Sequence, residues 1–241
     1  GISILMLGLL GQPASAASLQ VSPTWVNFDA KEQARSVWLS NSGSDIIRGQ
    51  VRLFNWQQKN GQELLTPSTT MVATPAIVTI QPGQKQLVRL VLPQRASTKE
   101  PVISEKTYRL VVNELPASSE HANGLQFLLS YSVPVFVNQK NASSSQTPLQ
   151  DVNFSLDTIN GKPVLTVDNH QGSHIKISQV TFTPGNGKAV TLVPGLLGYT
   201  LAKQKMQWPI NASESMLKNG GVLSAMVNND TKPQKLPVRG S

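Results

Sequence analysis

His170 and His174 are the residues whose types and spacing come nearest to a metal or catalytic site. Two histidines four residues apart on a helix would lie on one face and could bind a zinc ion. Here they flank Gln171-Gly172-Ser173, a sequence typical of a loop, which favours a turn over a metal site. The sequence patterns of serine hydrolases, dinucleotide-binding loops, phosphate-binding loops and zinc proteases are absent.

The other reactive residue types form no catalytic constellation either. The chain has no cysteine, which excludes disulfides, cysteine-bound metals and thiol nucleophiles. Its 13 acidic residues are spread singly through turns and strand ends, so they indicate no acid–base pair. We therefore expect a protein that is not an enzyme and that uses no cofactor and no metal.

The most informative segment, residues 125–137, alternates between apolar and small or polar side chains. Its apolar positions are Leu125, Phe127, Leu129, Tyr131, Val133, Val135 and Val137. In a strand these side chains share one face, which is either buried in the protein's own core or offered to a partner. Pro134 favours an edge strand, because proline donates no backbone hydrogen bond. Another chain can add a strand to such an edge.

Turn and strand signals place this segment in an all-β fold. The pair Asn-Gly, which favours tight hairpins, begins at residues 60, 123, 160, 186 and 219. Runs of β-forming residues lie between these turns, and no helical period of apolar residues competes with them. The expected strands are 36–40, 49–56, 77–80, 86–92, 108–115, 125–137, 163–167, 175–182 and 221–227. Many short strands at this spacing predict β-sandwiches.

A polar stretch, residues 138–150, divides the chain into two parts of sandwich size. We expect an immunoglobulin-like domain at 17–138, a linker at 139–149 and a second such domain at 150–241. Residues 1–16 are expected to be part of a signal peptide, because an apolar run precedes small residues that a signal peptidase could cleave. The run is too short to span a bilayer, so we expect no membrane insertion. Export of a chain without cysteine suits the bacterial periplasm, where we expect the protein to be located.

The charge of the chain is basic but scattered. It has 21 Lys and Arg against 13 Asp and Glu, which gives a net charge of +8. This excess favours acidic partners through long-range attraction. Because the basic residues occur singly, without a dense run, we expect no nucleic-acid partner.

Three stretches of the first domain resemble the periplasmic chaperones of chaperone–usher pilus assembly. They are residues 80–90 (IQPGQKQLVRL), residues 108–116, which end in NELP, and residues 119–126 (SEHANGLQ). Their order and spacing match the family over the first domain, whereas the second domain is similar to it only in size and strand content. The resemblance implies two immunoglobulin-like domains in an L shape, with pilus subunits and an outer-membrane usher as partners.

The same resemblance implies that one strand of the first domain completes the unfinished sandwich of a pilus subunit. The residues of this donor strand would be Leu125, Phe127, Leu129, Tyr131 and Val133. In the better-known branches of the family, a basic pair also holds the carboxylate at the subunit's C-terminus. The matching residues here are Trp25 and Pro134, and this departure resembles the archaic branch of the family.

Strand pairing suggests a substitute for the missing pair. If Leu115 pairs with Leu125, then Lys106 faces Pro134 and Arg109 faces Tyr131. Lys106 and Arg109 are then candidate carboxylate anchors, because cations hold carboxylates through charge-assisted hydrogen bonds. The alternative is that both are solvated strand cations.

Arg89 is a third candidate anchor. The resemblance aligns it with a structural arginine that pairs with an acid matching Glu105, with Asp230 of the second domain as a further partner. We therefore expect Arg89, Glu105 and Asp230 at the domain interface.

Two classes of function remain. The leading hypothesis is a chaperone that binds, folds and caps pilus subunits and delivers them to the usher. The alternative is an exported adhesin or glycan-binding module built from the same two domains. Such a binder should present aromatic side chains in loops, whereas Trp25, Trp38 and Trp56 lie in strand-like stretches. This placement favours the chaperone.

Overall fold

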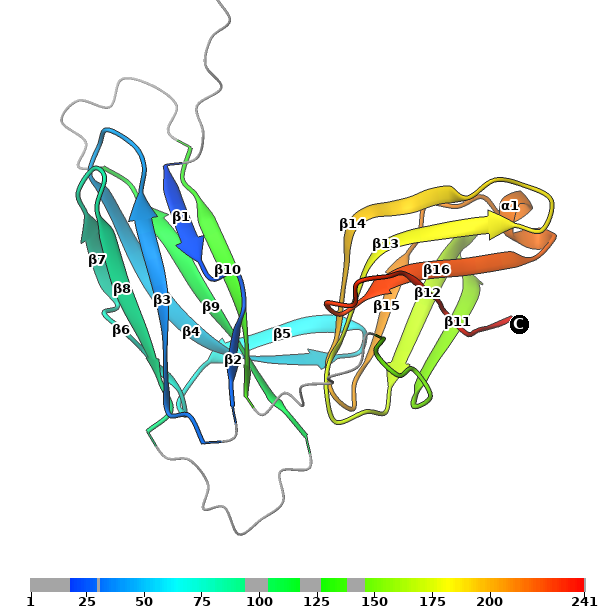
Figure 1. Cartoon of the computed structure of the whole chain (residues 1–241), viewed down its shortest axis with the longest axis horizontal. Helices are drawn as coiled ribbons and strands as arrows, with labels where there is room; N and C mark the ends of the chain where they lie inside the picture. Colours follow the sequence, from blue (N-terminus) through cyan, green and yellow to red (C-terminus); the bar gives the residue numbers. More distant parts are fainter. Residues whose placement is uncertain (1–17, 30, 94–103, 118–126, 138–145, 241) are drawn as a thin grey trace, which may run out of the picture.

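The computed structural model describes residues 18–29, 31–93, 104–117, 127–137 and 146–240. Over these residues the chain forms two β-sandwiches that meet at an angle (Figure 1). Strands β1 to β10 build the first and β11 to β18 the second. The expected signal peptide lies outside the described residues.

The first sandwich consists of two sheets packed face to face. Its strands are β1 (Leu19–Ser22), β2 (Val26–Phe28), β3 (Ala34–Asn41), β4 (Ile47–Lys59), β5 (Gln62–Pro67), β6 (Val72–Thr74), β7 (Ile77–Ile80), β8 (Lys85–Val91), β9 (Lys106–Leu115) and β10 (Ser130–Val137). One sheet has the order β1-β3-β8-β6. The other has the order β2-β10-β9-β4-β5, and β7 also pairs with β4.

Alternate residues of these strands fill the space between the two sheets. Val88 and Leu90 of β8 and Leu110 and Val112 of β9 are buried, whereas the residues between them are at least partly accessible. This period of two is the pattern of a strand with one face in the core. The outward face of the β9 sheet is turned toward the second sandwich (Figure 1).

The second sandwich has the same plan. Its elements are β11 (Val152–Ile159), β12 (Lys162–Asn169), β13 (Ile175–Pro184), β14 (Val190–Thr200), β15 (Lys205–Pro209), α1 (Glu214–Lys218), β16 (Gly221–Val227), β17 (Gln234–Lys235) and β18 (Val238–Gly240). The sheets have the orders β15-β12-β11-β18 and β14-β13-β16-β17. Leu149, expected in the linker, belongs to the core of this sandwich.

The Asn-Gly pairs do not all form the expected hairpins. Asn60-Gly61 joins β4 to β5 and Asn160-Gly161 joins β11 to β12, each with positive φ at both residues. Asn219, in contrast, is the C-terminal cap of α1, and Gly220 follows it with φ of +74°. A glycine with positive φ ends a helix as readily as it forms a hairpin, which explains this wrong prediction. Asn186-Gly187 has no positive φ. Residues 123–124 lie outside the described residues.

Candidate functional site

The first half of β10 is a free strand edge. β10 pairs with β9 from Ser130 to Val137, but its parallel pairing with β2 covers only Val135 to Val137. Within the part of the chain that the structure describes, no strand pairs with the other side of Ser130–Pro134. Pro134, which has no N–H to donate, stands directly before the doubly paired stretch, as expected for an edge position.

The side chains on one face of this segment are buried in the core at its C-terminal end and exposed to solvent at its N-terminal end. Val133 is only 3% exposed and belongs to the core of the first sandwich. Leu129 and Tyr131 are partly buried against the same core, and the Tyr131 hydroxyl donates to the Leu19 carbonyl. Phe127 is 83% exposed. The donor-strand residues expected from the sequence therefore differ in availability: Phe127 is free, whereas Val133 already fills the protein's own core. Leu125 lies outside the described residues.

The pairing of β9 with β10 differs from the expected register by three residues. Arg109 faces Pro134, Lys106 faces Val137, and Tyr131 faces Val112. The expected register assumed pairing from Leu125 onward, but β10 begins only at Ser130, so a longer connection displaces the partners. Lys106 and Arg109 are three positions apart and therefore lie on opposite faces of β9, which rules out a shared site on one face.

Arg109 lies where the two domains meet. Its guanidinium carbon is 3.8 Å from the centre of the Trp56 ring and 5.5 Å from that of Tyr199, in the second domain. Burial lowers the pKa of Arg109, and the nearby Tyr199 and Glu63 partly oppose this shift. The cation is thus held over aromatic rings, a favourable cation–π arrangement.

Lys176 brings a second cation to the same junction. It is the cross-strand neighbour of Tyr199, and its Nζ donates to the Asn229 side-chain oxygen at 3.0 Å. Burial lowers the pKa of Lys176. Lys176 also lines a small pocket together with Trp25, Phe136 and Tyr199. Tyr199 thus has a cation from each domain as a neighbour, Arg109 from the first and Lys176 from the second.

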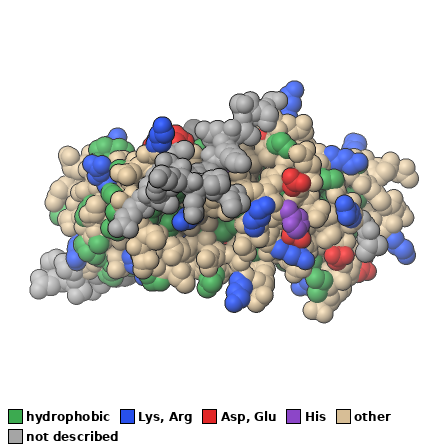
Figure 2. Space-filling view, turned by 90° about the horizontal axis from the view of Figure 1, so that it is seen from below, with side chains coloured by type: hydrophobic (Ala, Val, Ile, Leu, Met, Phe, Trp, Pro, Cys, Tyr) green, Lys and Arg blue, Asp and Glu red, His purple; other side chains and the backbone are tan. Residues whose placement is uncertain are grey.

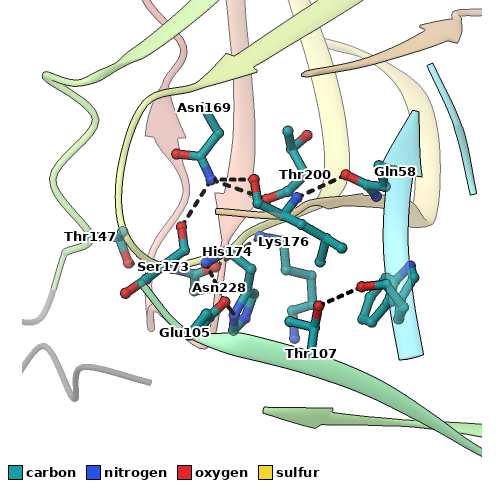
Figure 3. Close-up of polar contacts among 12 residues, drawn as sticks. Gln58, Glu105, Thr107, Thr147, Asn169, Ser173, His174, Lys176, Thr200 and Asn228 are labelled. Carbon is teal, nitrogen blue, oxygen red and sulfur yellow. Dashed lines mark hydrogen bonds and ion pairs between the residues drawn. The ribbon is translucent and has the colours of Figure 1, made fainter. Parts of the chain in front are cut away.

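A buried polar contact between Glu105 and His174 joins the domains (Figure 3). Glu105 Oε1 accepts the backbone N–H of His174 at 2.5 Å and lies 2.7 Å from its Nδ1. The Glu105 N–H donates to the Gly172 carbonyl at 2.9 Å. The His174 ring stacks on Phe136 of β10, with ring centres 3.9 Å apart. Neither the carboxylate nor the histidine is reached by much solvent, which strengthens these bonds.

Gln58 forms a second contact between the domains. Its amide nitrogen donates to the Tyr199 carbonyl at 2.8 Å, and its amide oxygen accepts the Leu201 N–H at 2.9 Å. Close by, Trp56 and Phe136 of the first domain pack with Leu201 in a cluster separate from both cores. The hairpin that carries Gln58, formed by β4 and β5, extends toward the second sandwich (Figure 1).

The expected interface of Arg89, Glu105 and Asp230 is only partly found. Glu105 lies at the junction, but its partner is His174. Arg89 is exposed on β8 in the opposite sheet, and no ion pair links it to either acid among the residues described. Asp230 accepts hydrogen bonds from the N–H and hydroxyl of Thr147, both at 2.8 Å. It therefore fastens the end of the expected linker to the second domain.

His170 and His174 do not form a joint site. His170 lies 3.3 Å from Asp168, whereas His174 turns toward Glu105. Among the described residues no group of three or more His, Asp or Glu side chains could hold a metal ion. Nothing in the sequence around His174 signalled its role at the junction.

One face of the molecule shows how its basic side chains are distributed. On the face drawn in Figure 2, Lys and Arg side chains stand singly over both sandwiches. In the described part of the chain, no helix is long and apolar enough to cross a bilayer.

Two linked β-sandwiches, the first with a half-unpaired edge strand, define a protein suited to binding a partner by strand addition. The chain belongs to the family of pili and flagellar-assembly chaperones, whose PapD N-terminal domain matches residues 18–142. This confirms the family to which the sequence motifs pointed.

Individual relatives agree with this assignment. The chaperone protein PapD of Escherichia coli is 28% identical over 121 residues, which are 50% of this chain and 48% of PapD. The chain thus spans about half the length of that curated relative.

Solved structures share the fold over both domains. One is the CsuC–CsuE chaperone–tip adhesion subunit pre-assembly complex from archaic Csu pili of Acinetobacter baumannii. A chain of it is similar over 93% of this chain and 100% of its own length, with a TM-score of 0.67 and 22% identity. A chain of the Salmonella enterica complex of SafA pilin with the SafB chaperone is similar over 91% and 95%, with a TM-score of 0.60 and 15% identity. These likenesses confirm the expected all-β fold of two immunoglobulin-like domains.

Proposed function

We propose that this protein is a periplasmic, non-enzymatic chaperone that captures pilus subunits, completes their fold with its own strand and delivers them to an outer-membrane usher. The observation that carries the proposal is the free edge of Ser130–Pro134, preceded by the exposed Phe127. Family membership supports it. So do the solved complexes of CsuC with a tip adhesion subunit and of SafB with a pilin, since each contains a chain with this fold.

Within the described residues, the donor strand of the proposal runs from Phe127 to Pro134. Main-chain groups of the edge provide hydrogen bonds, and alternate side chains fill a groove in the subunit. Phe127 supplies the largest free apolar surface, while Leu129 and Tyr131 bridge the chaperone core and the subunit. Val133 acts indirectly, because its burial fixes the strand that carries the others.

Arg109 is our leading candidate for the carboxylate anchor, and Lys176 its partner. Arg109 stands directly opposite Pro134 and near the Tyr199 ring, and Tyr199 also lines the small pocket of Trp25 and Lys176. A carboxylate placed there would meet two partly desolvated cations from different domains. Lys106 and Arg89 are weaker candidates. Lys106 lies on the opposite face of β9 from Arg109, and Arg89 lies on β8 in the other sheet.

The same chain needs no nucleotide for this task. Its sequence has no ATP-binding motif. Binding energy at the strand edge, followed by exchange for the strand of the next subunit, would drive capture and release. The domain contacts through Glu105 and Gln58 hold the second sandwich in place beside the captured subunit.

Co-expression in a bacterial periplasm tests the proposal. A candidate subunit is produced with the wild-type chain, with Phe127→Asp, or alone, and its soluble yield is measured. We expect recovery of a one-to-one complex only with the wild type and degradation of the subunit otherwise. A subunit that is equally stable without the chain would contradict the chaperone and favour an adhesin or glycan-binding module.

A further inference from the structure

The outward face of the β4, β7, β9 and β10 sheet carries arginines that the capture of a C-terminus does not use. Arg48 and Arg52 are both exposed on β4, and the Arg52 guanidinium lies 5.4 Å from the centre of the Phe54 ring. Ile77, 51% exposed on the neighbouring β7, adds apolar surface. We call this surface, with Arg48, Arg52 and Ile77 at its centre, the arginine face.

Among the described residues, no acid on these four strands points to the side of the arginine face. The outward positions of these four strands hold three arginines, Arg48, Arg52 and Arg109, and no carboxylate. Glu63 of the neighbouring strand β5 accepts hydrogen bonds from Trp56 and Gln58. No salt bridge involves Arg48 or Arg52 among the described residues. Within the described part of the chain, Arg48 and Arg52 therefore present positive charge that no ion pair compensates.

The arginine face adjoins the free strand edge. Arg52 is the cross-strand neighbour of Val111, and Val111 is that of Ser132 on β10. Arg52 thus lies two strands, about 10 Å, from the edge at which a partner strand would be added. A partner docked at that edge brings the rest of its body alongside the two arginines.

We propose that the arginine face recognises an acidic surface on the captured pilus subunit and so selects which subunits are captured quickly. This inference rests on the proposed chaperone function. Opposite charges across an interface steer encounter and discriminate against partners of the wrong charge more than they add affinity. The position of the face beside the strand edge, together with its apolar residues, favours a protein partner over a lipid surface.

The test compares association rates of two charge-matched variants. The probe is the subunit that co-purifies with the wild-type chain, unfolded in urea and diluted into each chaperone. The double variant Arg48→Glu and Arg52→Glu changes the arginine face. The control, Lys85→Glu and Arg89→Glu, changes the total charge equally on exposed positions of the opposite sheet. Melting temperatures establish that both variants are folded.

We expect the Arg48/Arg52 reversal to lower the association rate constant about tenfold at low salt, and the loss to shrink at about 0.5 M salt. The control and the conservative Arg48→Lys, Arg52→Lys variant should stay within about twofold of wild type. If both charge-reversal variants associate equally slowly, or if neither associates more slowly than the wild type, the proposed role of the arginine face is wrong. Loss of binding to phosphatidylglycerol vesicles by the Arg48/Arg52 variant alone would assign the face to a membrane instead.

Failure of the chaperone function would look different. In that case Phe127→Asp would capture the probe as well as the wild type does, whatever the arginine variants do. A selective effect of the arginine face on a subunit that still requires Phe127 supports both inferences together.

Discussion

Glu105 and His174 come from different domains and share one carboxylate oxygen for two contacts. Glu105 Oε1 accepts the His174 N–H at 2.5 Å and lies 2.7 Å from Nδ1. Because a carboxylate oxygen can only accept, Nδ1 carries the proton of that bond. The contact sits at the starts of β9 and β13, so it fixes the second domain relative to the sheet that contains the free edge.

Replacing Glu105 by Ala should lower the free energy of unfolding by about 2 kcal/mol, because two buried donors of His174 lose their acceptor. Glu105→Gln keeps one acceptor oxygen and should cost less. Urea unfolding of the free chain measures both. The control is Arg89→Ala, which we expect within about 0.5 kcal/mol of wild type because Arg89 is exposed. A large loss in Arg89→Ala would restore the interface role that the family resemblance implied.

Gln58→Ala should weaken the junction by about 1 to 3 kcal/mol. The substitution leaves the Tyr199 carbonyl and the Leu201 N–H without their partners in a buried contact. Small-angle scattering should then show a broader distribution of domain angles. Gln57→Ala, on the exposed side of the same strand, is the matched control. If both variants scatter like the wild type, the aromatic cluster alone holds the angle.

Phe127→Asp and Val133→Asp should fail in different ways. Phe127 is exposed, so its replacement leaves the free chain folded and abolishes subunit capture, since an unpaired carboxylate in an apolar groove is costly. Val133 is in the core, so its replacement lowers the melting temperature of the free chain. Circular dichroism and co-purification separate the two effects. A Phe127→Asp variant that unfolds would show that residue 127 also belongs to the core.

Much of the fold could be predicted because strand periodicity and turn residues are local signals. Each of the nine expected strands overlaps an observed one, with only the start of β10 clearly displaced. Strands such as β5 escaped prediction because all of its residues are exposed, so no buried face imposes an alternation. The helix α1 escaped because its five residues are too few to show a helical period.

The candidate site could be predicted only in part, because it depends on pairing between distant segments. The alternation at residues 125–137 predicted one continuous apolar face, but it did not show that this face is buried from Val133 onward and exposed at Phe127. The register of β9 with β10 depends on a connection whose length the alternation does not reveal. His174 and Gln58 were missed because a single buried polar residue leaves no pattern along the chain.

Lys176→Met should stabilise the free chain at neutral pH. Burial lowers the pKa of Lys176, so the folded state holds its ammonium less favourably than the unfolded state does. The unfolded state therefore binds more protons between the lowered pKa and the ordinary value near 10.4, and wild-type stability rises with pH in that window. The advantage of Lys176→Met should thus be present at neutral pH and disappear toward about pH 10. Urea midpoints measured across this range provide the check.

Arg109 and Lys176 should be needed for capture, although neither is needed for folding. Arg109 lies opposite Pro134 and Lys176 lines the pocket with Trp25, and a subunit carboxylate held between them would lose its water and depend on both cations. Arg109→Ala combined with Lys176→Met should therefore sharply reduce the yield of complex, whereas Lys106→Ala, on the other face of β9, should not. A subunit extended by a few residues at its C-terminus should give an equally low yield of complex with the wild-type chain, because its carboxylate is moved out of reach of the two cations. If the extended subunit is captured normally, no carboxylate is held there, and Arg109 serves the domain junction through Trp56 and Tyr199 alone.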